Sequence, residues 1–293
     1  MIYDIRLVLG YDYASAAGAG RHLARLMPLD VMGAQRLVAG LISIDPRPEE
    51  RRDGRDFFGN HLVEFACRAR HDSLELVMQA RVDRQVALLV EDRATGFATL
   101  AADLGICTDL GPGSPLHMMA ASPRVPLDTA TTWFASKLVK PGQSVLQVVR
   151  AVGQALHDHM TFDPRATQVD TPLAEAFAAR KGVCQDYSHI LIACLRGVGI
   201  PAGYVSGFLR TEPPPGKPRL EGADAMHAWV RAWCGTAMGW VEYDPTNDCM
   251  VRDEHIVVGY GRDYSDVAPI KGILRVSGRQ NGRQAVDVIP LAG

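Results

Sequence analysis

The chain has 293 residues and 47% of them are hydrophobic, which is enough for one large or two ordinary domains with a sizeable core. Its 31 Lys and Arg nearly balance 33 Asp and Glu, for a formal net charge of -2. Such a charge creates no long-range field to gather nucleic acid or anionic membrane, so we predict neither as a partner. The start lacks a signal-peptide pattern and no apolar run approaches about 20 residues, so we expect a cytoplasmic protein without a membrane span.

The six cysteines follow no regular spacing and include no CxxC pair. In a chain of this size, that pattern favours free thiols over a disulfide framework or a structural zinc site. We interpret five of them as small buried hydrophobes. These are Cys67, Cys107, Cys194, Cys234 and Cys249.

Residues 1–105 are predicted to form an amino-terminal β-rich domain. Apolar residues alternate with polar ones from residue 2 to 9, which is typical of a half-buried strand. An alanine-rich stretch up to Pro28 is predicted to form a short helix. Further strands are expected at residues 36–44, 61–69 and 74–82, with turn residues between them. Together these patterns predict an antiparallel β-sandwich.

Residues 106–128 are rich in Gly, Pro and Ser and are predicted to be a linker. The remaining residues, 129–293, should form a second domain in which helices come first and strands follow, an α+β order. We expect residues 210–224 to be a surface loop and Asn281-Gly282 to be a hairpin turn. The helices are predicted at 129–138, 145–159, 171–180 and 184–199, and the strands at 201–209, 227–233, 240–244, 256–260, 273–276 and 285–291.

Cys184 stands at a position that favours reactivity. It follows Gly182 and opens an apolar helix, so the helix dipole and unpaired backbone N–H groups would favour its thiolate. A cysteine nucleophile also needs a base and a group that orients the base, and neither need be near it in sequence. His227 and Asp244 each lie on a predicted strand of one antiparallel sheet, and neighbouring strands would bring them together.

Three segments carry a family resemblance. They are Gly182-Val183-Cys184-Gln185-Asp186-Tyr187-Ser188-His189, His227-Ala228-Trp229-Val230 and Gly239-Trp240-Val241-Glu242-Tyr243-Asp244-Pro245-Thr246-Asn247. They resemble the motifs of the bacterial transglutaminase-like superfamily, whose core is papain-like. The first domain also looks like the β-rich domain that precedes this core in many bacterial members, notably at residues 56–63. Residues 261–269 resemble the family's segment after the third motif.

This resemblance implies a papain-like core of helices packed on an antiparallel sheet. It also implies that Cys184 is the nucleophile, His227 its partner and Asp244 the orienting acid. The reaction would be attack on a peptide or isopeptide carboxamide with a thioester intermediate and no metal or organic cofactor. Water as acceptor would give a protease or amidase, which we favour, and an amine acceptor would give a transglutaminase.

Several readings remain open beside the triad. Gln185 is a candidate oxyanion donor next to the backbone N–H of Cys184, and Trp229 and Tyr264 are candidates for lining the cleft or simply for core packing. His189 fits a packed, hydrogen-bonded histidine better than a base, and Cys184, His189, His227 and Asp244 lack the close ligand pair of a metal site. A non-catalytic module that binds a partner protein is the rival from another class. The sequence assigns no oligomeric state.

Overall fold

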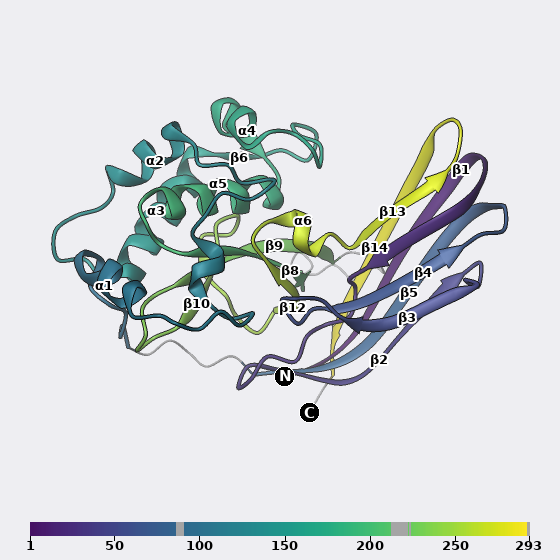
Figure 1. The fold of residues 1–293 in the computed structure, drawn as a ribbon, viewed down its shortest axis with the longest axis horizontal. Coiled ribbons are helices and arrows are strands. Elements are labelled where there is room, and N and C mark those ends of the chain that lie inside the picture. Colours follow the sequence, from purple (N-terminus) through teal and green to yellow (C-terminus); the bar gives the residue numbers. More distant parts are fainter. Residues whose placement is uncertain (86–90, 212–221, 223, 292–293) are drawn as a thin grey trace, which may run out of the picture.

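The computed structural model describes residues 1–85, 91–211, 222 and 224–291. It is an α+β structure with two lobes (Figure 1). One lobe is a curled antiparallel sheet of seven strands, and the other packs helices on an antiparallel sheet of five strands. The fold class predicted from the sequence is therefore confirmed.

A single long strand, β1 (Ile2–Ala24), organises the β-rich lobe. Its first half pairs with β5 and β14, and its second half pairs with β4 and β13. Tyr3, Ile5, Leu7 and Leu9 alternate into the core as the period of two predicts. The other strands are β2 (Gln35–Asp45), β3 (Glu50–Arg55), β4 (His61–Cys67), β5 (His71–Arg84), β13 (Ile270–Arg275) and β14 (Gln280–Pro290).

The prediction of a helix between residue 9 and Pro28 is wrong, because β1 continues to Ala24. The alanines lie where β1 passes from one set of partners to the other, with register shifts on both sides of Ala17 and Gly18. Ala17 is fully buried. Strand pairing along both edges of β1 outweighs the small intrinsic preference of alanine for helix.

The last two strands belong to the β-rich lobe. Both β13 and β14 pair with β1, whereas the expected division grouped them with the catalytic core. The turn between them also differs from the expectation. Asn281 and Gly282 lie inside β14 opposite Asp12 and Tyr11, and the chain turns before them at Gly278, which has a φ of 90°.

The segment predicted as a linker packs against the helical lobe. Within it, Met118 and Val125 are fully buried, and η2 (Pro115–Met118) forms a short 3-10 helix. Just before it, α1 (Leu100–Gly105) contributes Leu100 and Leu104 to the core of this lobe, and Phe97 of η1 (Phe97–Thr99) packs against that core. The Pro- and Gly-rich composition therefore marks irregular backbone rather than a free tether.

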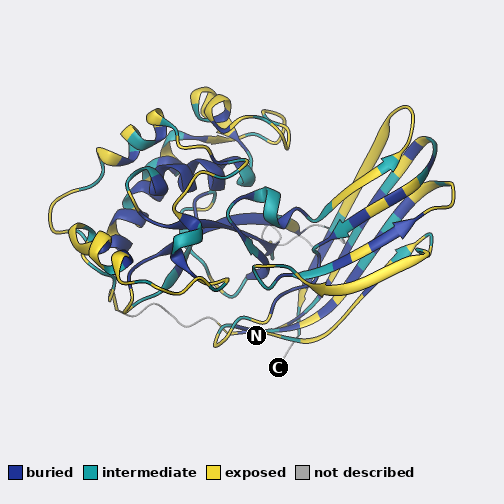
Figure 2. Cartoon of the chain, viewed as in Figure 1, coloured by how far each residue is buried: buried dark blue, intermediate teal, exposed yellow. Residues whose placement is uncertain are grey.

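The helical lobe is built on a sheet with strand order β11-β10-β9-β8-β12. Its central helix α5 is dark blue along most of its length in Figure 2, because eleven of its residues are buried. The strands are β8 (Ala202–Leu209), β9 (Ala225–Trp233), β10 (Trp240–Asp244), β11 (Cys249–Met250) and β12 (His255–Gly261), and β6 (Thr161–Phe162) pairs with β7 (Lys181–Gly182). The helices are α2 (Thr129–Ser136), α3 (Val145–His159), α4 (Leu173–Ala179), α5 (Cys184–Gly197) and α6 (Tyr264–Val267).

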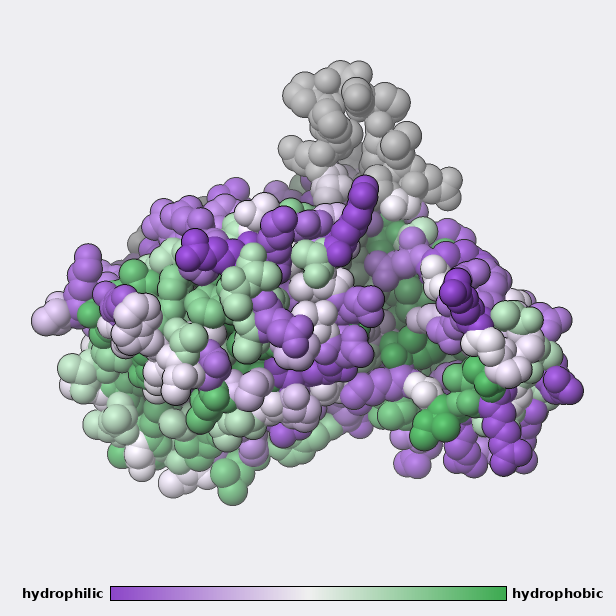
Figure 3. Space-filling model, turned by 90° about the horizontal axis from the view of Figure 1, so that it is seen from above, coloured by the Kyte–Doolittle hydropathy of each residue, from purple (hydrophilic) through white to green (hydrophobic). Residues whose placement is uncertain are grey.

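Apolar residues also reach the surface of the helical lobe, which lies on the left in Figure 3. Leu127, Trp133 and Phe162 are among its exposed large hydrophobics. Among the described residues, no helix combines the length and the apolar character needed to cross a membrane. Most of the predicted loop 210–224 lies outside the described residues.

A glycine fixes the approach of α3 to the sheet. A methyl group on Gly153 would overlap the buried ring of Tyr243, the residue before Asp244. We expect Gly153→Ala to destabilise the fold by about 1–2 kcal/mol, because overpacking outweighs the gain of about 1 kcal/mol in helix propensity. Gly105→Ala at the end of α1 is the matched control, since its methyl group meets no atom within 4 Å and should not destabilise. Chemical denaturation of both variants measures the difference, and equal effects would contradict this account of the packing.

Candidate active site

The start of α5 is held in a defined geometry around Cys184. The carboxylate of Asp186 reaches back and accepts the backbone N–H of Val183 at 2.8 Å and the hydroxyl of Thr167 at 2.6 Å. A Cβ at Gly182 would lie 2.6 Å from this carboxylate, so only glycine permits the close approach. Val183 is extended and Cys184 is the first helical residue, which leaves backbone N–H groups of the first turn unpaired within the helix.

The thiol of Cys184 differs from the others in its surroundings. It is partly exposed at the helix start, whereas Cys67, Cys194 and Cys234 are buried, and all six cysteines are free. Burial raises the pKa of these three thiols, and that of Cys249 to about 11. The predicted burial is therefore confirmed for Cys67, Cys194 and Cys234 and is wrong for Cys107 and Cys249, which are only partly buried.

His227 on β9 and Asp244 at the end of β10 form a direct pair. Nε2 of His227 lies 2.7 Å from Oδ2 of Asp244, and a carboxylate can only accept, so Nε2 carries the proton. Burial opposes charge on this imidazole, but hydrogen bonds to Asp244 and to the thiol of Cys184 prevail and raise the pKa of His227 to about 10. The bond to Asp244 leaves the other ring nitrogen, Nδ1, available for a second partner.

Asp244 is the most heavily hydrogen-bonded group of the site. Its side chain has no solvent exposure, and its Oδ1 accepts the backbone N–H groups of Thr246 and Asn247 at 2.9 and 3.2 Å. Its Oδ2 accepts the Asn247 side-chain amide at 2.7 Å besides His227. Burial alone would raise the pKa of Asp244, but hydrogen bonds from His227 and His255 lower it, so the carboxylate stays ionised.

His255 is a second histidine beside Asp244 that the sequence did not single out. It opens β12, and its Nε2 lies 3.1 Å from Oδ2 of Asp244. The sequence contains only an apolar strand at residues 256–260 with a histidine in front of it, and no spacing connects that histidine with Asp244. The contact joins the end of β10 to the first residue of β12, two strands that are not neighbours in the sheet.

The three residues predicted as oxyanion donor or cleft lining, Gln185, Trp229 and Tyr264, lie in different surroundings. The amide of Gln185 donates to the carbonyl of Val169 at 2.9 Å, so it tethers a neighbouring loop. Trp229 is fully buried and donates its indole N–H to Glu242 at 2.8 Å, so it is a core residue. Tyr264 is partly buried at the start of α6, and its ring packs against Tyr204 at 6.3 Å.

His189 has the structural role favoured by the sequence. Its Nε2 accepts the backbone N–H of Tyr264 at 3.2 Å, and burial lowers the pKa of His189 to about 4. A neutral imidazole that accepts a backbone hydrogen bond is already satisfied. The motif histidine five residues after Cys184 therefore positions α6 against α5.

Within the described part of the chain, only His227, Asp244 and His255 bring three ligand atoms within 4.8 Å of one another as a metal site requires. This set shares two residues with the cluster considered from the sequence and replaces Cys184 and His189 with His255. Asn247 already donates to the same carboxylate oxygen, and the backbone N–H of Arg252 approaches Nδ1 of His255 at 3.4 Å. Hydrogen bonds therefore account for the convergence of the three side chains.

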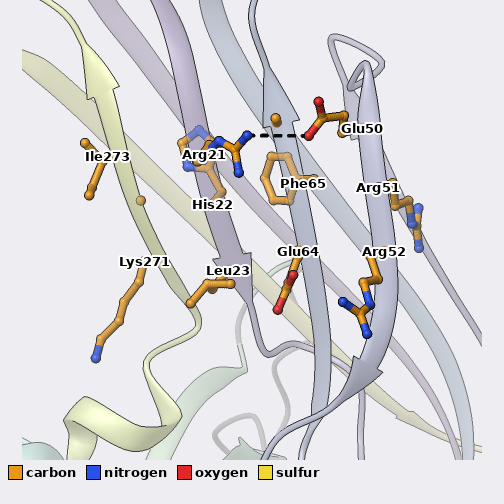
Figure 4. Close-up of a pocket in the computed structure, with 12 residues that line it drawn as sticks. Arg21, His22, Leu23, Glu50, Arg51, Arg52, Glu64, Phe65, Lys271 and Ile273 are labelled. Carbon is orange, nitrogen blue, oxygen red and sulfur yellow. Dashed lines mark ion pairs between the residues drawn. The ribbon is translucent and has the colours of Figure 1, made fainter.

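A cavity of about 900 Å³ lies elsewhere, on the β-rich lobe. Figure 4 shows its side chains on β1, β3, β4 and β13, with Arg21 paired to Glu50 at 3.8 Å. Glu64 and Arg52 are cross-strand neighbours, so each of the two carboxylates of this cavity lies near an arginine. Cys184, His227 and Asp244 do not line it.

Comparisons with known proteins agree with this arrangement. The transglutaminase-like superfamily matches residues 133–245, and the bacterial transglutaminase-like N-terminal region matches residues 3–83. The chain belongs to the transglutaminase-like superfamily. An uncharacterized protein of Mycobacterium tuberculosis, Rv2569c, is 35% identical over 268 residues, which cover 88% of this chain and 83% of that protein. An uncharacterized protein of Mycobacterium leprae, ML0607, is 30% identical over 285 residues, or 97% and 96% of the two chains.

A solved structure extends the superfamily likeness to the whole fold. It is a Cytophaga hutchinsonii protein regarded as a candidate cysteine protease. The match has a TM-score of 0.73 and covers 100% of this chain and 91% of that one. At 18% sequence identity, this likeness establishes the shared fold of both lobes.

The raised pKa of His227 predicts a pH dependence of stability. A histidine in the unfolded chain has a pKa of about 6.5. The interaction of His227 with Asp244 therefore contributes fully to the free energy of unfolding below about pH 6.5. This contribution is lost as the pH rises through about 10. Asp244 acts in the opposite sense, because its lowered pKa gives a contribution that is present above about pH 4 and lost on acidification.

Urea denaturation of the wild type and of His227→Gln between about pH 6 and pH 10.5 tests this expectation. The difference in unfolding free energy between the two proteins should shrink as the pH rises, since glutamine carries no titrating proton. Other titrating groups cancel in the comparison. A difference that stays constant over this range would contradict the assignment.

Proposed function

We propose that the protein is a cysteine acyl-transfer enzyme that hydrolyses peptide or isopeptide amides. The observation that carries the proposal is the 2.7 Å hydrogen bond between His227 on β9 and Asp244 on β10, with α5, which Cys184 opens, packed against β9. A nucleophile, a base and a group that orients the base are the parts that covalent acyl transfer needs. Membership of the superfamily supports the same assignment.

In the proposed reaction, the Cys184 thiolate attacks the amide carbonyl carbon and a C–S bond forms. His227, protonated at Nδ1, gives that proton to the departing nitrogen as the C–N bond breaks, which leaves a thioester and a free amine. The backbone N–H groups of the first turn of α5 are the donors available to the oxyanion. Asp244 keeps Nε2 of His227 protonated throughout, so Nδ1 is the nitrogen that exchanges protons.

Water then completes the cycle. It adds to the thioester carbonyl while Nδ1 of His227 removes its proton, and the C–S bond breaks to give a carboxylic acid and the free enzyme. Cys184 is partly exposed, which favours access of water to the thioester over its exclusion. The substrate would be a peptide or protein, and the proposed chemistry needs no organic cofactor.

Selective alkylation tests the activation of Cys184. At neutral pH, iodoacetamide should label Cys184 roughly tenfold faster than the other five thiols, because a histidine-paired thiolate reacts where protonated thiols do not. Cys184→Ala should abolish the fast phase. Cys107→Ala is the matched control, since Cys107 is also partly exposed but opens no helix, and it should leave the fast phase unchanged. Equal labelling of all six thiols would overturn the proposal.

The acyl acceptor is tested separately. A panel of peptide amides is incubated with the enzyme, quenched in acid and analysed by mass spectrometry, with and without an excess of a primary amine. We expect a thioester adduct on Cys184 and a product that bears a new carboxylate. Incorporation of the amine in place of water would identify a transglutaminase, and the lack of any adduct over a diverse panel would favour the non-catalytic binding module.

A further inference from the structure

We infer that His255 is a positioning residue for Asp244 and that the β-rich lobe holds it in place. The inference rests on the proposed function, because it concerns how the carboxylate that orients His227 is itself oriented. It gives the amino-terminal domain a role in the chemistry although, among the described hydrogen bonds, none joins residues 1–85 to His227 or Asp244. The chain of contacts runs from Gln35 and Asn60 through β12 to His255 and then to Asp244.

The hydrogen bonds of His255 define its proton arrangement. The backbone N–H of Arg252 donates to Nδ1, so the proton of a neutral ring lies on Nε2, which faces Oδ2 of Asp244 at 3.1 Å. Trp229 packs edge-on against the ring at 5.2 Å, with an angle of 83° between the planes. His255 is only 3% exposed, so this donor is fixed in direction and shielded from water.

Oδ2 of Asp244 therefore receives donors from two histidines on different strands. One of them, His227, changes its bonding to Cys184 during the proposed reaction. The other, His255, faces the carboxylate and makes no contact with the thiol among the described hydrogen bonds. A constant donor limits rotation of the carboxylate, so its orientation toward His227 is maintained.

β12 has a free edge that the β-rich lobe covers. This strand pairs with β8 on one side only, and its other backbone groups face the first lobe. The side-chain amide of Gln35 donates to the carbonyl of Val257 at 2.8 Å and accepts its N–H at 2.9 Å. The backbone N–H of Leu29 donates to the same carbonyl at 3.0 Å.

Asn60 repeats this arrangement three residues further along β12. Its amide donates to the carbonyl of Tyr260 at 2.8 Å and accepts the N–H of Tyr260 at 2.8 Å. Asp56 accepts the Asn60 amide at 3.0 Å and is itself paired with Arg25 at 2.7 Å, which fixes the direction of the amide. The segment at residues 56–63 that resembles the family's first domain thus supplies one of the two amides that hold β12.

The side-chain amides of Gln35 and Asn60 each bond both the N–H and the C=O of one residue of β12. They make the hydrogen bonds that a neighbouring strand would make. They prevent β12 from fraying and leave no unpaired edge at these residues. Because His255 is the first residue of β12, its distance from Asp244 depends on where this strand lies. A shift of β12 by even about 1 Å would break the 3.1 Å contact.

The test measures alkylation of Cys184 by iodoacetamide at about pH 6.5 and about pH 9.5. A free cysteine forms its thiolate readily at the higher pH, whereas at the lower pH it needs the imidazole as a base. The rate at about pH 6.5 divided by the rate at about pH 9.5 therefore reports whether the histidine is correctly oriented. His255→Leu should lower this ratio roughly tenfold. His255→Gln should restore most of it, because its amide nitrogen is as many bonds from Cβ as Nε2 is.

His255→Asn, whose amide is one bond shorter, is a second variant that removes the donor if leucine does not fold. Ile256→Val is the matched control, since Ile256 is the buried neighbour on β12 that packs in the core of the β-rich lobe. It should leave the ratio unchanged. The titratable groups that interact with Asp244 include His227, His255, Tyr243 and Cys249, and Cys249 is replaced by alanine in all proteins compared so that only one thiol lies beside the carboxylate.

The link to the β-rich lobe has its own test. Asn60→Ala should lower the same ratio, and combining it with His255→Leu should lower it no further, because both act through one donor. Arg81→Ala is the control, since it breaks only an exposed ion pair with Asp4 in the same lobe and should have no effect. Additive effects, or an unchanged ratio in Asn60→Ala, would overturn the link.

An unchanged ratio in His255→Leu would overturn the inference about His255, provided that the wild type still labels selectively at Cys184. A wild type that labels all cysteines equally would instead overturn the proposed function. The two failures are therefore distinguishable in one experiment. Circular dichroism of each variant shows whether a change in the ratio comes from a folded protein.

Discussion

The structure depends on keeping one carboxylate ionised without contact with water. Asp244 is fully buried, and burial of an unpaired charge costs several kcal/mol. The protein offsets this cost with donors from a turn, an amide and two histidines, all directed at two oxygens. Because so many elements must meet at this point, the carboxylate defines how β9, β10 and β12 are placed relative to one another.

The position of Cys184, the proposed nucleophile, is fixed by a separate set of local constraints. Glycine at residue 182 and aspartate at residue 186 determine how the chain enters α5, and Cys184 is thereby placed at the positive end of a buried helix. Neither constraint involves Asp244. The site therefore combines a locally determined helix start with a pair that exists only when the sheet has formed, and His227 is where the two meet.

The two lobes are joined by more than apolar packing. Phe208, Ile256 and Val258 of the second sheet extend the core of the β-rich lobe, and side-chain amides complete the edge of β12 beside them. The chain also ends in the lobe where it begins, because β14 pairs with the first half of β1. The helical lobe is therefore an insertion between strands of one sheet, and its position is defined at both of its ends.

Local patterns in the sequence were sufficient for most of the elements. The periods of two and of about 3.6 and the glycine before Cys184 are properties of neighbouring residues, and they predicted α2, α3, α4 and the start of α5, whereas the short helices α1 and α6 were not predicted. The three motifs also identified the residues that the structure brings together, since His227 and Asp244 lie on adjacent strands. The alanine-rich part of β1 was predicted as helix because propensity describes an isolated segment, whereas this one is paired on both edges.

The sequence by itself determined the α+β order and the position of Cys184 at the start of a helix, because each of these is encoded in neighbouring residues, and the family resemblance of three short motifs selected His227 and Asp244 as its proposed partners. Only the tertiary structure decided that β13 and β14 return to the first sheet, that Trp229 is a core residue and that His255 bonds Asp244. These facts depend on which distant strands pair and in what register. Pairing of that kind is selected by the burial and hydrogen bonding of the whole molecule, so no local pattern contains it.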